Sequence, residues 1–116
     1  MPRRELINSS YSSMWLIAMF DLPVVTKKER KAAAKFRKEL LKDGFSMLQY
    51  SVYGRYCASE AAAKPHRDAV VAALPPTGQV RIIAITERQF EKMENFVGKK
   101  PAMITPEAIS EQLTFF

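Results

Sequence analysis

Cysteine is nearly absent from this chain of 116 residues, which has one cysteine, one histidine and four glycines. The lone Cys57 has no partner for an internal disulfide, so a disulfide-stabilised fold is excluded. Long hydrophobic runs are also missing, since the longest falls far short of the roughly 20 apolar residues that span a bilayer. The positively charged start of the sequence is not followed by an apolar segment of the kind found in secretory signals. These absences predict a soluble, cytoplasmic protein without membrane contact.

The chain does contain enough apolar side chains to form a core. Hydrophobic residues make up 47% of the sequence, which suffices at this length to bury a core without disulfides or structural metal. The length fits one domain of ordinary size. We therefore expect a single domain over residues 1–116 and no second one.

Positive charge is concentrated in one segment, although the whole chain has a formal net charge of only +6. Residues 27–42 hold eight cations against two acids, Glu29 and Glu39, so their excess of six equals that of the whole chain. Charges in the remainder cancel, which indicates that an anionic partner would meet this segment. The eight cations are Lys27, Lys28, Arg30, Lys31, Lys35, Arg37, Lys38 and Lys42.

The same segment has the pattern of an amphipathic helix. Thr26 is a suitable N-cap with Glu29 three residues later, and Gly44 stands where a helix is expected to end. A solvated helix surface is the simpler interpretation of its polar side. Six like charges on one side repel each other, however, and the arrangement costs stability unless an anion offsets it. At about 100° per residue, these six lie opposite the apolar side chains and are here named the lysine face: Lys27, Lys28, Lys31, Lys35, Lys38 and Lys42.

The other segments alternate between strand and helix patterns. The apolar run before Asp21 predicts a buried strand over residues 14–20. Pro65 falls inside the second helical segment and is expected to delay its start, whereas the strand that follows is apolar enough to be central in a sheet. After the lysine-rich helix, the expected elements are a hairpin over residues 45–57, a helix over 58–74, a strand over 80–86 and a short helix over 87–94.

This order is the βαββαβ pattern of an α+β ferredoxin-like fold, in which two helices cover one face of an antiparallel sheet. The other face stays bare, and a bare apolar face needs a partner. We therefore expect a homodimer, to which the C-terminal tail can add an edge strand. Residues 1–13 are expected to form an N-terminal extension, and residues 98–116 a tail that packs at the dimer or partner interface.

Asp21 is the first candidate functional residue. It is a carboxylate at the point where a buried strand surfaces, so it can hold a hard cation, and the neighbouring lysines can hold phosphate. This pairing points to a phosphodiester substrate. The plainer alternative is a turn residue, because an aspartate before Leu22 and Pro23 can cap the loop with its side chain.

Weaker candidates lie outside these features. Arg55, in the predicted hairpin, is a modest phosphate candidate. His66 has no cysteine or serine partner at a motif spacing, so a surface role is the better interpretation. Cys57 is interpreted as a small packed residue. Tyr50 and the neighbouring tyrosines could stack bases, but their spacing does not follow the RNA-recognition-motif consensus and half of them should face the core.

Four segments, taken in order, resemble a known family. They are the strand ending Met19-Phe20-Asp21, the basic helix, Leu48-Gln49-Tyr50-Ser51-Val52-Tyr53-Gly54-Arg55 and Ile85-Thr86-Glu87-Arg88-Gln89-Phe90. Together they resemble the small CRISPR-associated protein of spacer acquisition, the second of the two adaptation proteins (Cas-two), in the version found beside type II systems. The likeness runs from about Trp15 to about Met93.

The resemblance implies a ferredoxin-like homodimer in which two copies of Asp21 face each other across the two-fold axis. There they would share Mg²⁺, or another divalent cation such as Mn²⁺. Members of the family are described as metal-dependent endonucleases on RNA or DNA, which would make Asp21 the catalytic and metal-binding residue. A second implied role is architectural: the dimer bridges two copies of the larger adaptation integrase and holds duplex DNA. In that role Asp21 need not catalyse.

Three functions therefore compete. The leading one is a nucleic-acid-binding subunit of the spacer-acquisition complex with Mg²⁺-dependent phosphodiesterase activity on double-stranded DNA or single-stranded RNA. The second is a non-catalytic DNA-bridging scaffold for the adaptation integrase. The third is a ferredoxin-like regulatory or interaction module, whose lysines merely keep it in solution. In the first two functions we expect the lysine face and Arg55 to contact nucleic acid.

Overall fold

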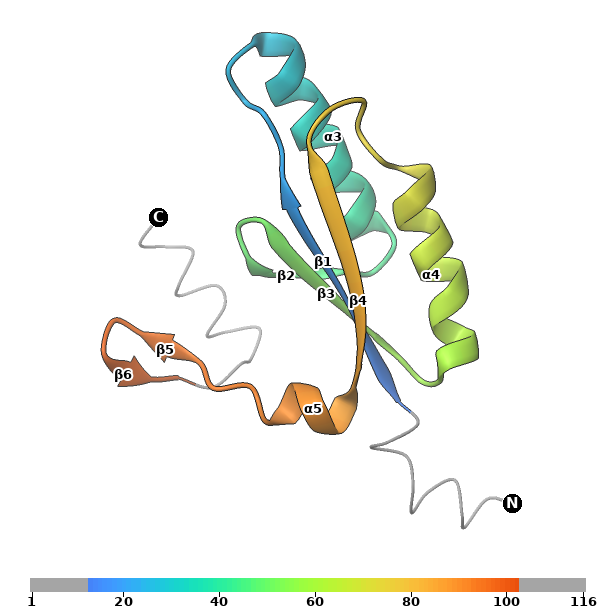
Figure 1. Cartoon of the computed structure of the whole chain (residues 1–116), viewed down its shortest axis with the longest axis vertical. Helices are drawn as coiled ribbons and strands as arrows, with labels where there is room; N and C mark the ends of the chain where they lie inside the picture. Colours follow the sequence, from blue (N-terminus) through green and yellow to red (C-terminus); the bar gives the residue numbers. More distant parts are fainter. Residues whose placement is uncertain (1–12, 103–116) are drawn as a thin grey trace.

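The structure, a computed structural model, describes residues 13–102. Its main strands form one four-stranded antiparallel sheet in the order β2-β3-β1-β4, and two long helices flank it (Figure 1). The predicted ferredoxin-like α+β fold is thereby confirmed. In chain order the elements are β1 (Met14–Asp21), α3 (Lys27–Lys42), β2 (Ser46–Gln49), β3 (Val52–Cys57), α4 (Glu60–Ala72) and β4 (Gln79–Thr86).

Alternation along β1 decides which side chains enter the core. Leu16, Ala18 and Phe20 are at most 7% exposed and belong to one apolar cluster. Phe36 of α3 and Val70 of α4 belong to the same cluster. Because both helices reach the same side chains of β1, both cover the same face of the sheet. We call the opposite face, toward which the alternate residues of β1 point, the bare face.

The start and end of α3 follow the predicted capping pattern. The Thr26 hydroxyl accepts a hydrogen bond from the Glu29 amide at 3.1 Å, and the Glu29 carboxylate accepts one from the Thr26 amide at 2.8 Å. This reciprocal pair satisfies two amides that have no partner inside the helix. At the other end, Gly44 has φ +90°, a value that L side chains rarely adopt. Glycine at this position therefore lets the chain turn from the helix into β2.

The expectation that Pro65 delays the second helix is wrong. The helix α4 begins at Glu60, and the hydroxyl of Ser59 accepts a hydrogen bond from the Ala62 amide at 3.0 Å. Pro65 is the sixth residue of α4, where it removes one backbone hydrogen bond and its ring crowds the carbonyl of Ala61, but it does not shift the start of the helix. The Ser59 cap and the alanines of the first turn fix where the helix starts.

The expectation that the last long strand is central is also wrong, because β4 lies at the edge of the sheet. The apolar side chains of β4 lie on both faces of the sheet. Val80 and Ile82 pack against the core cluster, whereas Ile83 points to the bare face and is 48% exposed. The continuous apolar pattern of this strand therefore reflects apolar side chains on both faces and does not indicate a central position.

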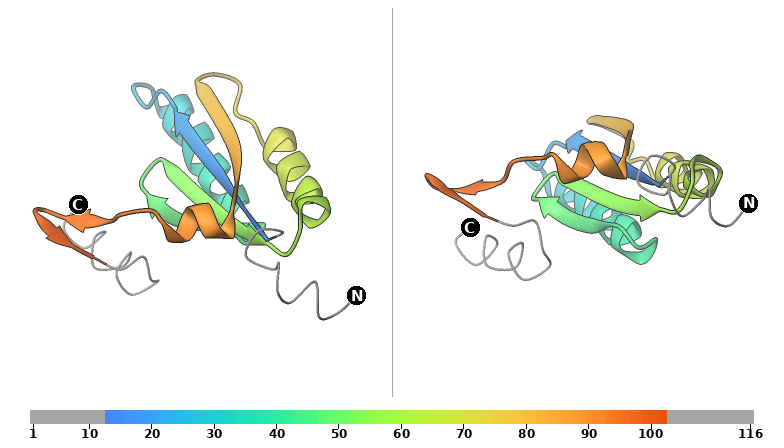
Figure 2. Two further views of the ribbon diagram at one scale, coloured as in Figure 1. Left: turned by 60° about the horizontal axis from the view of Figure 1, so that its bottom comes forward. Right: turned by 90° about the horizontal axis from the view of Figure 1, so that it is seen from below.

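The chain after β4 covers one end of the bare face and then leaves the sheet. A short helix, α5 (Glu87–Glu91), places the Phe90 ring flat against Trp15 with ring centroids 4.0 Å apart. A small hairpin of β5 (Phe96–Val97) and β6 (Lys100–Pro101), which the sequence pattern did not predict, extends away from the sheet (Figure 2). The predicted N-terminal extension, apart from Ser13, and residues 103–116 of the predicted tail lie outside the described residues. Over residues 13–102, no helix is long and apolar enough to cross a membrane.

Tyr53 gives a testable stability prediction. Its side chain is fully buried, and its hydroxyl has no hydrogen-bond partner among residues 13–102. Leaving a buried polar group unpaired costs about 1–3 kcal/mol, so we expect Tyr53→Phe to raise the free energy of unfolding by about 1 kcal/mol. Urea denaturation at neutral pH measures this gain. A loss of stability would mean that the hydroxyl has a partner elsewhere in the chain.

The same residue predicts how stability changes at high pH. Burial raises the pKa of Tyr53 above its ordinary value of 10.0, although the positive charge of Arg37 acts in the opposite direction. The tyrosinate therefore forms more easily in the unfolded chain than in the folded one. Stability is unaffected below about pH 10 and falls as the pH rises above it. The Tyr53→Phe variant should show a smaller loss in that range.

Candidate nucleic-acid interface

The structure places the lysine face on the outer surface of α3. All six lysines are exposed, whereas Ala33, Phe36 and Leu40 are buried on the side of the helix toward the sheet. None of the six forms an ion pair with a carboxylate of residues 13–102. From Lys27 to Lys42 the row extends about 22 Å, at 1.5 Å per residue. It is therefore a long positive surface whose charge the described part of the protein does not neutralise.

Asp21 is the last residue of β1 and is exposed. It lies opposite Gln79 in the register with β4. Because side chains alternate along a strand, Asp21 shares the side of β1 that carries Ile17 and Met19, away from the core residue Phe20. The carboxylate therefore projects from the end of the bare face.

The lysine face and Asp21 are not brought together at one spot within a protomer, contrary to what their closeness in the sequence suggests. The apolar side of α3 packs on the sheet, so its lysines are turned away from the sheet. Asp21 projects from the opposite face of the sheet. Of the six lysines, Lys27 and Lys28 lie nearest to Asp21 along the chain, because a short loop joins the end of β1 to the start of α3 (Figure 1).

The loop over residues 22–26 connects Asp21 to α3 and has defined internal contacts. The Arg30 guanidinium donates hydrogen bonds to the carbonyls of Val24 at 3.2 Å and Val25 at 2.8 Å. On the other side of Asp21, Gly78 has φ +98°, and a side chain there would come within 2.9 Å of the Asp21 carbonyl oxygen. Glycine is required at this position because the turn before β4 runs directly against Asp21 and Leu22.

Arg55 has a structural position that the sequence pattern did not indicate. Its Nε donates to the Asp43 carbonyl at 2.8 Å and its Nη1 to the Tyr56 carbonyl at 2.7 Å. The side chain is partly buried and lies against Gly44, between β3 and the end of α3. Arg55 therefore connects the sheet to the helix, and its role as a phosphate contact stays a prediction.

His66 and Cys57 also have structural surroundings. His66 Nδ1 lies 2.9 Å from the Asp43 carboxylate, and both side chains are partly buried, so the histidine joins α4 to the end of α3 and is less exposed than predicted. Cys57 is only 3% exposed. Burial raises the pKa of its thiol, which Arg55 counteracts in part. A buried thiol with a raised pKa is a poor nucleophile, in agreement with the prediction of a packed residue.

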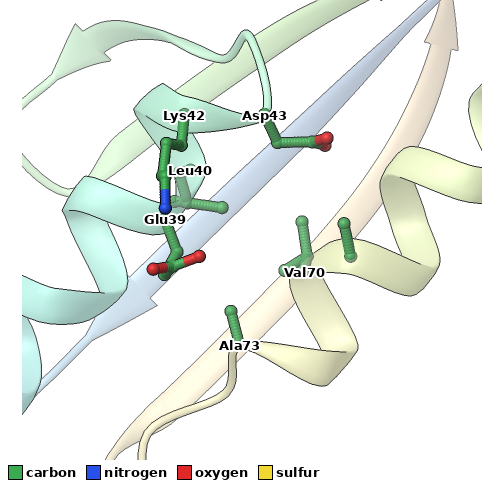
Figure 3. A pocket seen from close by; sticks show the side chains of 7 residues that line it. Glu39, Leu40, Lys42, Asp43, Val70 and Ala73 are labelled. Carbon is green, nitrogen blue, oxygen red and sulfur yellow. The ribbon is translucent and has the colours of Figure 1, made fainter.

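A shallow pocket opens between α3 and α4 on the helical side of the molecule (Figure 3). Leu40 and Val70 of the core form part of its wall, and its charged lining consists of the carboxylates of Glu39 and Asp43 and the ammonium group of Lys42. It lies on the face of the sheet opposite to Asp21. The pocket is therefore separate from the carboxylate that the sequence singles out.

A single protomer does not offer a complete set of protein ligands for a metal. In the described ranges, no three histidine, cysteine, aspartate or glutamate side chains gather closely enough to hold an ion. Asp21 is one carboxylate. Mg²⁺ is nevertheless often held by only one or two carboxylates together with water and substrate phosphates. The single Asp21 of a protomer meets the lower limit of that pattern, in which water and phosphate supply the other ligands.

Sequence reasoning considered Tyr50 for base stacking but missed the cluster that it forms with Arg37, at the end of the sheet where Asp21 lies. Tyr50, in the two-residue turn between β2 and β3, is 64% exposed, and the Arg37 guanidinium carbon lies 4.2 Å from its ring centroid. The same carbon lies 5.7 Å from the ring centroid of Phe20, the neighbour of Asp21. Arg37 stood out in the sequence only as one of eight cations. The distance of 13 residues between it and Tyr50 gave no local signal that the two side chains touch.

Comparisons with known proteins agree on one family. The profile of the family described as "CRISPR associated protein Cas2" matches residues 14–93. A protein of Flavobacterium psychrophilum named "CRISPR-associated endoribonuclease Cas2" is 46% identical over 108 residues, which cover 93% of this chain and 92% of that protein. A protein of the same name from Parvibaculum lavamentivorans is 55% identical over 87 residues, which cover 75% of this chain and 86% of that protein.

A solved structure gives the same result for the fold. The structure titled "Crystal structure of cas2" aligns with a TM-score of 0.52 and 20% sequence identity, and the alignment covers 81% of this chain and 99% of that one. At this identity the likeness supports the fold alone. The matched segment begins with β1 and ends after α5, so it includes Asp21, the lysine face and the β2–β3 turn. The chain belongs to the Cas2 family of CRISPR-associated proteins.

Proposed function

We propose that the protein is a nucleic-acid-binding subunit of the CRISPR spacer-acquisition complex with metal-dependent phosphodiesterase activity. The observation that carries this proposal is the lysine face, which exposes six cations with no carboxylate partner among residues 13–102. A row of exposed cations suits the phosphate backbone of a duplex, which carries regularly spaced negative charges. Such contacts are electrostatic and do not read the base sequence. Homologous proteins that carry the name endoribonuclease support the phosphodiesterase part.

The proposal includes a homodimer that packs through the bare face. Ile83 is 48% exposed on this face, and Met19 and Val52 are only partly covered, which leaves an apolar surface that the exposed Arg81, opposite Met19, borders near Asp21. Covering such a surface with a second copy removes apolar area from water. It would also bring the two Asp21 carboxylates to one interface. A stable monomer in sedimentation at micromolar concentration would contradict this part of the proposal.

The proposed cofactor is Mg²⁺ or Mn²⁺, held by Asp21 from both protomers. When bound, such an ion can polarise a phosphate oxygen or lower the pKa of a water molecule. The protein's own contribution would be the placement of Asp21, which is fixed by the pairing of β1 with β4 and by the close turn at Gly78. Single-stranded RNA and double-stranded DNA are both proposed substrates.

A second function, a non-catalytic DNA bridge, is favoured by the separation of the lysine face from Asp21 within a protomer. The lysine face and Asp21 lie on opposite sides of the sheet, so a duplex held along α3 need not reach the carboxylate. The protein would then act as a non-catalytic bridge that holds DNA between two copies of the larger adaptation integrase. In this case Asp21 would serve the dimer interface or the loop after β1.

The function is tested by a salt titration of duplex binding, followed by co-purification with the integrase. Binding of a labelled blunt duplex, measured by fluorescence anisotropy, should weaken steeply as salt rises, with a log–log slope of about −5 if the six lysines each contact one phosphate. The integrase should co-purify with the wild-type protein. Duplex binding that is absent, or that does not respond to salt, would favour the regulatory or interaction module instead.

A further inference from the structure

An exposed tyrosine stands at the end of the sheet where Asp21 lies. Tyr50 and Ser51 form the turn between β2 and β3, and the Ser51 carbonyl accepts a hydrogen bond from the Phe20 amide at 3.0 Å. Phe20 directly precedes Asp21 in the chain. The turn is therefore fixed beside the last residues of β1, and the Tyr50 ring, with 64% of its surface exposed, is accessible to a ligand.

Arg37 holds this ring in place from one side. Its guanidinium carbon lies 4.2 Å from the Tyr50 centroid and 5.7 Å from the Phe20 centroid, so the cation is placed between an exposed ring and a buried one. Arg37 makes no ion pair with a carboxylate of the described chain, and its Nε is buried without a hydrogen-bond partner there. Contact with the cation orients the Tyr50 ring and leaves positive charge beside it.

Arg37 and Tyr50 lie between the lysine face and Asp21, which are on opposite sides of the sheet. Arg37 precedes Lys38 of the lysine face by one residue, and on the helix it lies between that face and the buried side. Through the turn, Tyr50 adjoins the β1 residues next to Asp21. A strand that leaves the lysine face on the side of Arg37 and runs toward Asp21 would pass over Tyr50.

We propose that Tyr50, oriented by Arg37, binds an unpaired nucleotide by stacking on its base. This inference rests on the proposed nucleic-acid-binding function and adds to it a binding site for unpaired bases, either in a single strand or in the single-stranded extension of a duplex. Aromatic side chains stack on bases of any sequence because every base presents a flat π surface, so no base preference is expected. Base pairs inside a duplex are already stacked on both faces and cannot take this position; only the outer face of a terminal pair is free.

The test compares three forms of one DNA sequence with three forms of the protein. The DNAs are a blunt duplex, the same duplex with a 3′ overhang, and the single strand, each at matched salt. The proteins are wild type, Tyr50→Leu and Tyr50→Phe. We expect Tyr50→Leu to weaken binding of the overhang DNA and of the single strand about tenfold, and to leave the blunt duplex unchanged. Tyr50→Phe should bind as wild type does, because phenylalanine keeps the ring.

A fluorescent base gives a second readout that a purely structural role would not change. With 2-aminopurine in the overhang, wild type and Tyr50→Phe should quench its fluorescence, and Tyr50→Leu should not. Equal loss on all three DNAs, or no loss on any, would overturn the proposed stacking site while leaving the nucleic-acid-binding function standing. Failure of the wild-type protein to bind any of the three at low salt would overturn that function itself.

Discussion

Replacing Lys31, Lys35 and Lys38 by glutamate is expected to lower duplex affinity on the order of 100-fold or more at about 0.1 M salt. Each lysine that neutralises a phosphate releases counterions, which contributes roughly 0.9 to the slope of log affinity against log salt. The loss of three contacts should therefore reduce that slope by about 2.7. Fluorescence anisotropy over a range of salt concentrations measures both changes.

A charge-matched variant separates position from total charge. Three exposed lysines outside α3, Lys64, Lys92 and Lys99, can be replaced by glutamate in the same way. Either triple substitution changes the charge by −6, so the net charge of +6 becomes zero in both proteins. We expect the control variant to bind within about threefold of wild type. An equal loss in the two variants would show that total charge and not the lysine face attracts the duplex.

Asp21→Asn is expected to lower metal-dependent cleavage on the order of 10³-fold while leaving nucleic-acid binding intact. The substitution keeps the size of the side chain but removes the anionic oxygen that a hard cation requires. A bound metal is worth several kcal/mol in the transition state, and each 1.36 kcal/mol corresponds to a factor of ten in rate. Single-turnover cleavage of single-stranded RNA and duplex DNA in Mg²⁺ measures the effect. Binding should be equal or slightly tighter, because one negative charge is removed.

The matched control is Asp68→Asn, which removes an exposed carboxylate from α4, where it pairs with Lys64 at 2.9 Å. This variant should cleave as wild type does. Equal cleavage by wild type and Asp21→Asn would place the activity at another site or in a contaminant. A wild-type protein that binds DNA and the integrase but does not cleave would support the bridging function, and an integration assay with Asp21→Asn would then show normal activity.

The sequence predicted the elements whose signals are local. The helix α3 was visible from Thr26, Glu29 and Gly44, because the capping box and the glycine stop lie within the segment that they terminate. The hairpin over β2 and β3 was also predicted. The edge position of β4 was not, because it depends on which strand pairs with which, and an apolar pattern does not carry that information. The β5–β6 hairpin has strands of only two residues, too short for a periodic pattern.

The candidate site could be predicted in its parts but not in its arrangement. Asp21 and the lysine face follow from the sequence pattern, and their exposure agrees with the prediction. That they lie on opposite sides of the sheet depends on the packing of α3 against β1, which only the fold reveals. The contact between Arg37 and Tyr50 likewise joins residues from different elements. Arg55 was selected for its charge, whereas its position depends on the carbonyls that surround it.

The contacts of Arg30 with the loop after β1 have a thermodynamic consequence for binding. Arg30 fixes the carbonyls of Val24 and Val25, and the Thr26–Glu29 pair closes the same loop at the helix, so little backbone freedom remains there in the free protein. Ordering a backbone residue costs about 1–2 kcal/mol of conformational entropy. The backbone of this loop is already ordered when the protein folds, so binding does not lose that conformational entropy again. A ligand that touches both Asp21 and the first turn of α3 therefore meets a preorganised surface, and its contact energy appears as affinity instead of being consumed in ordering the chain.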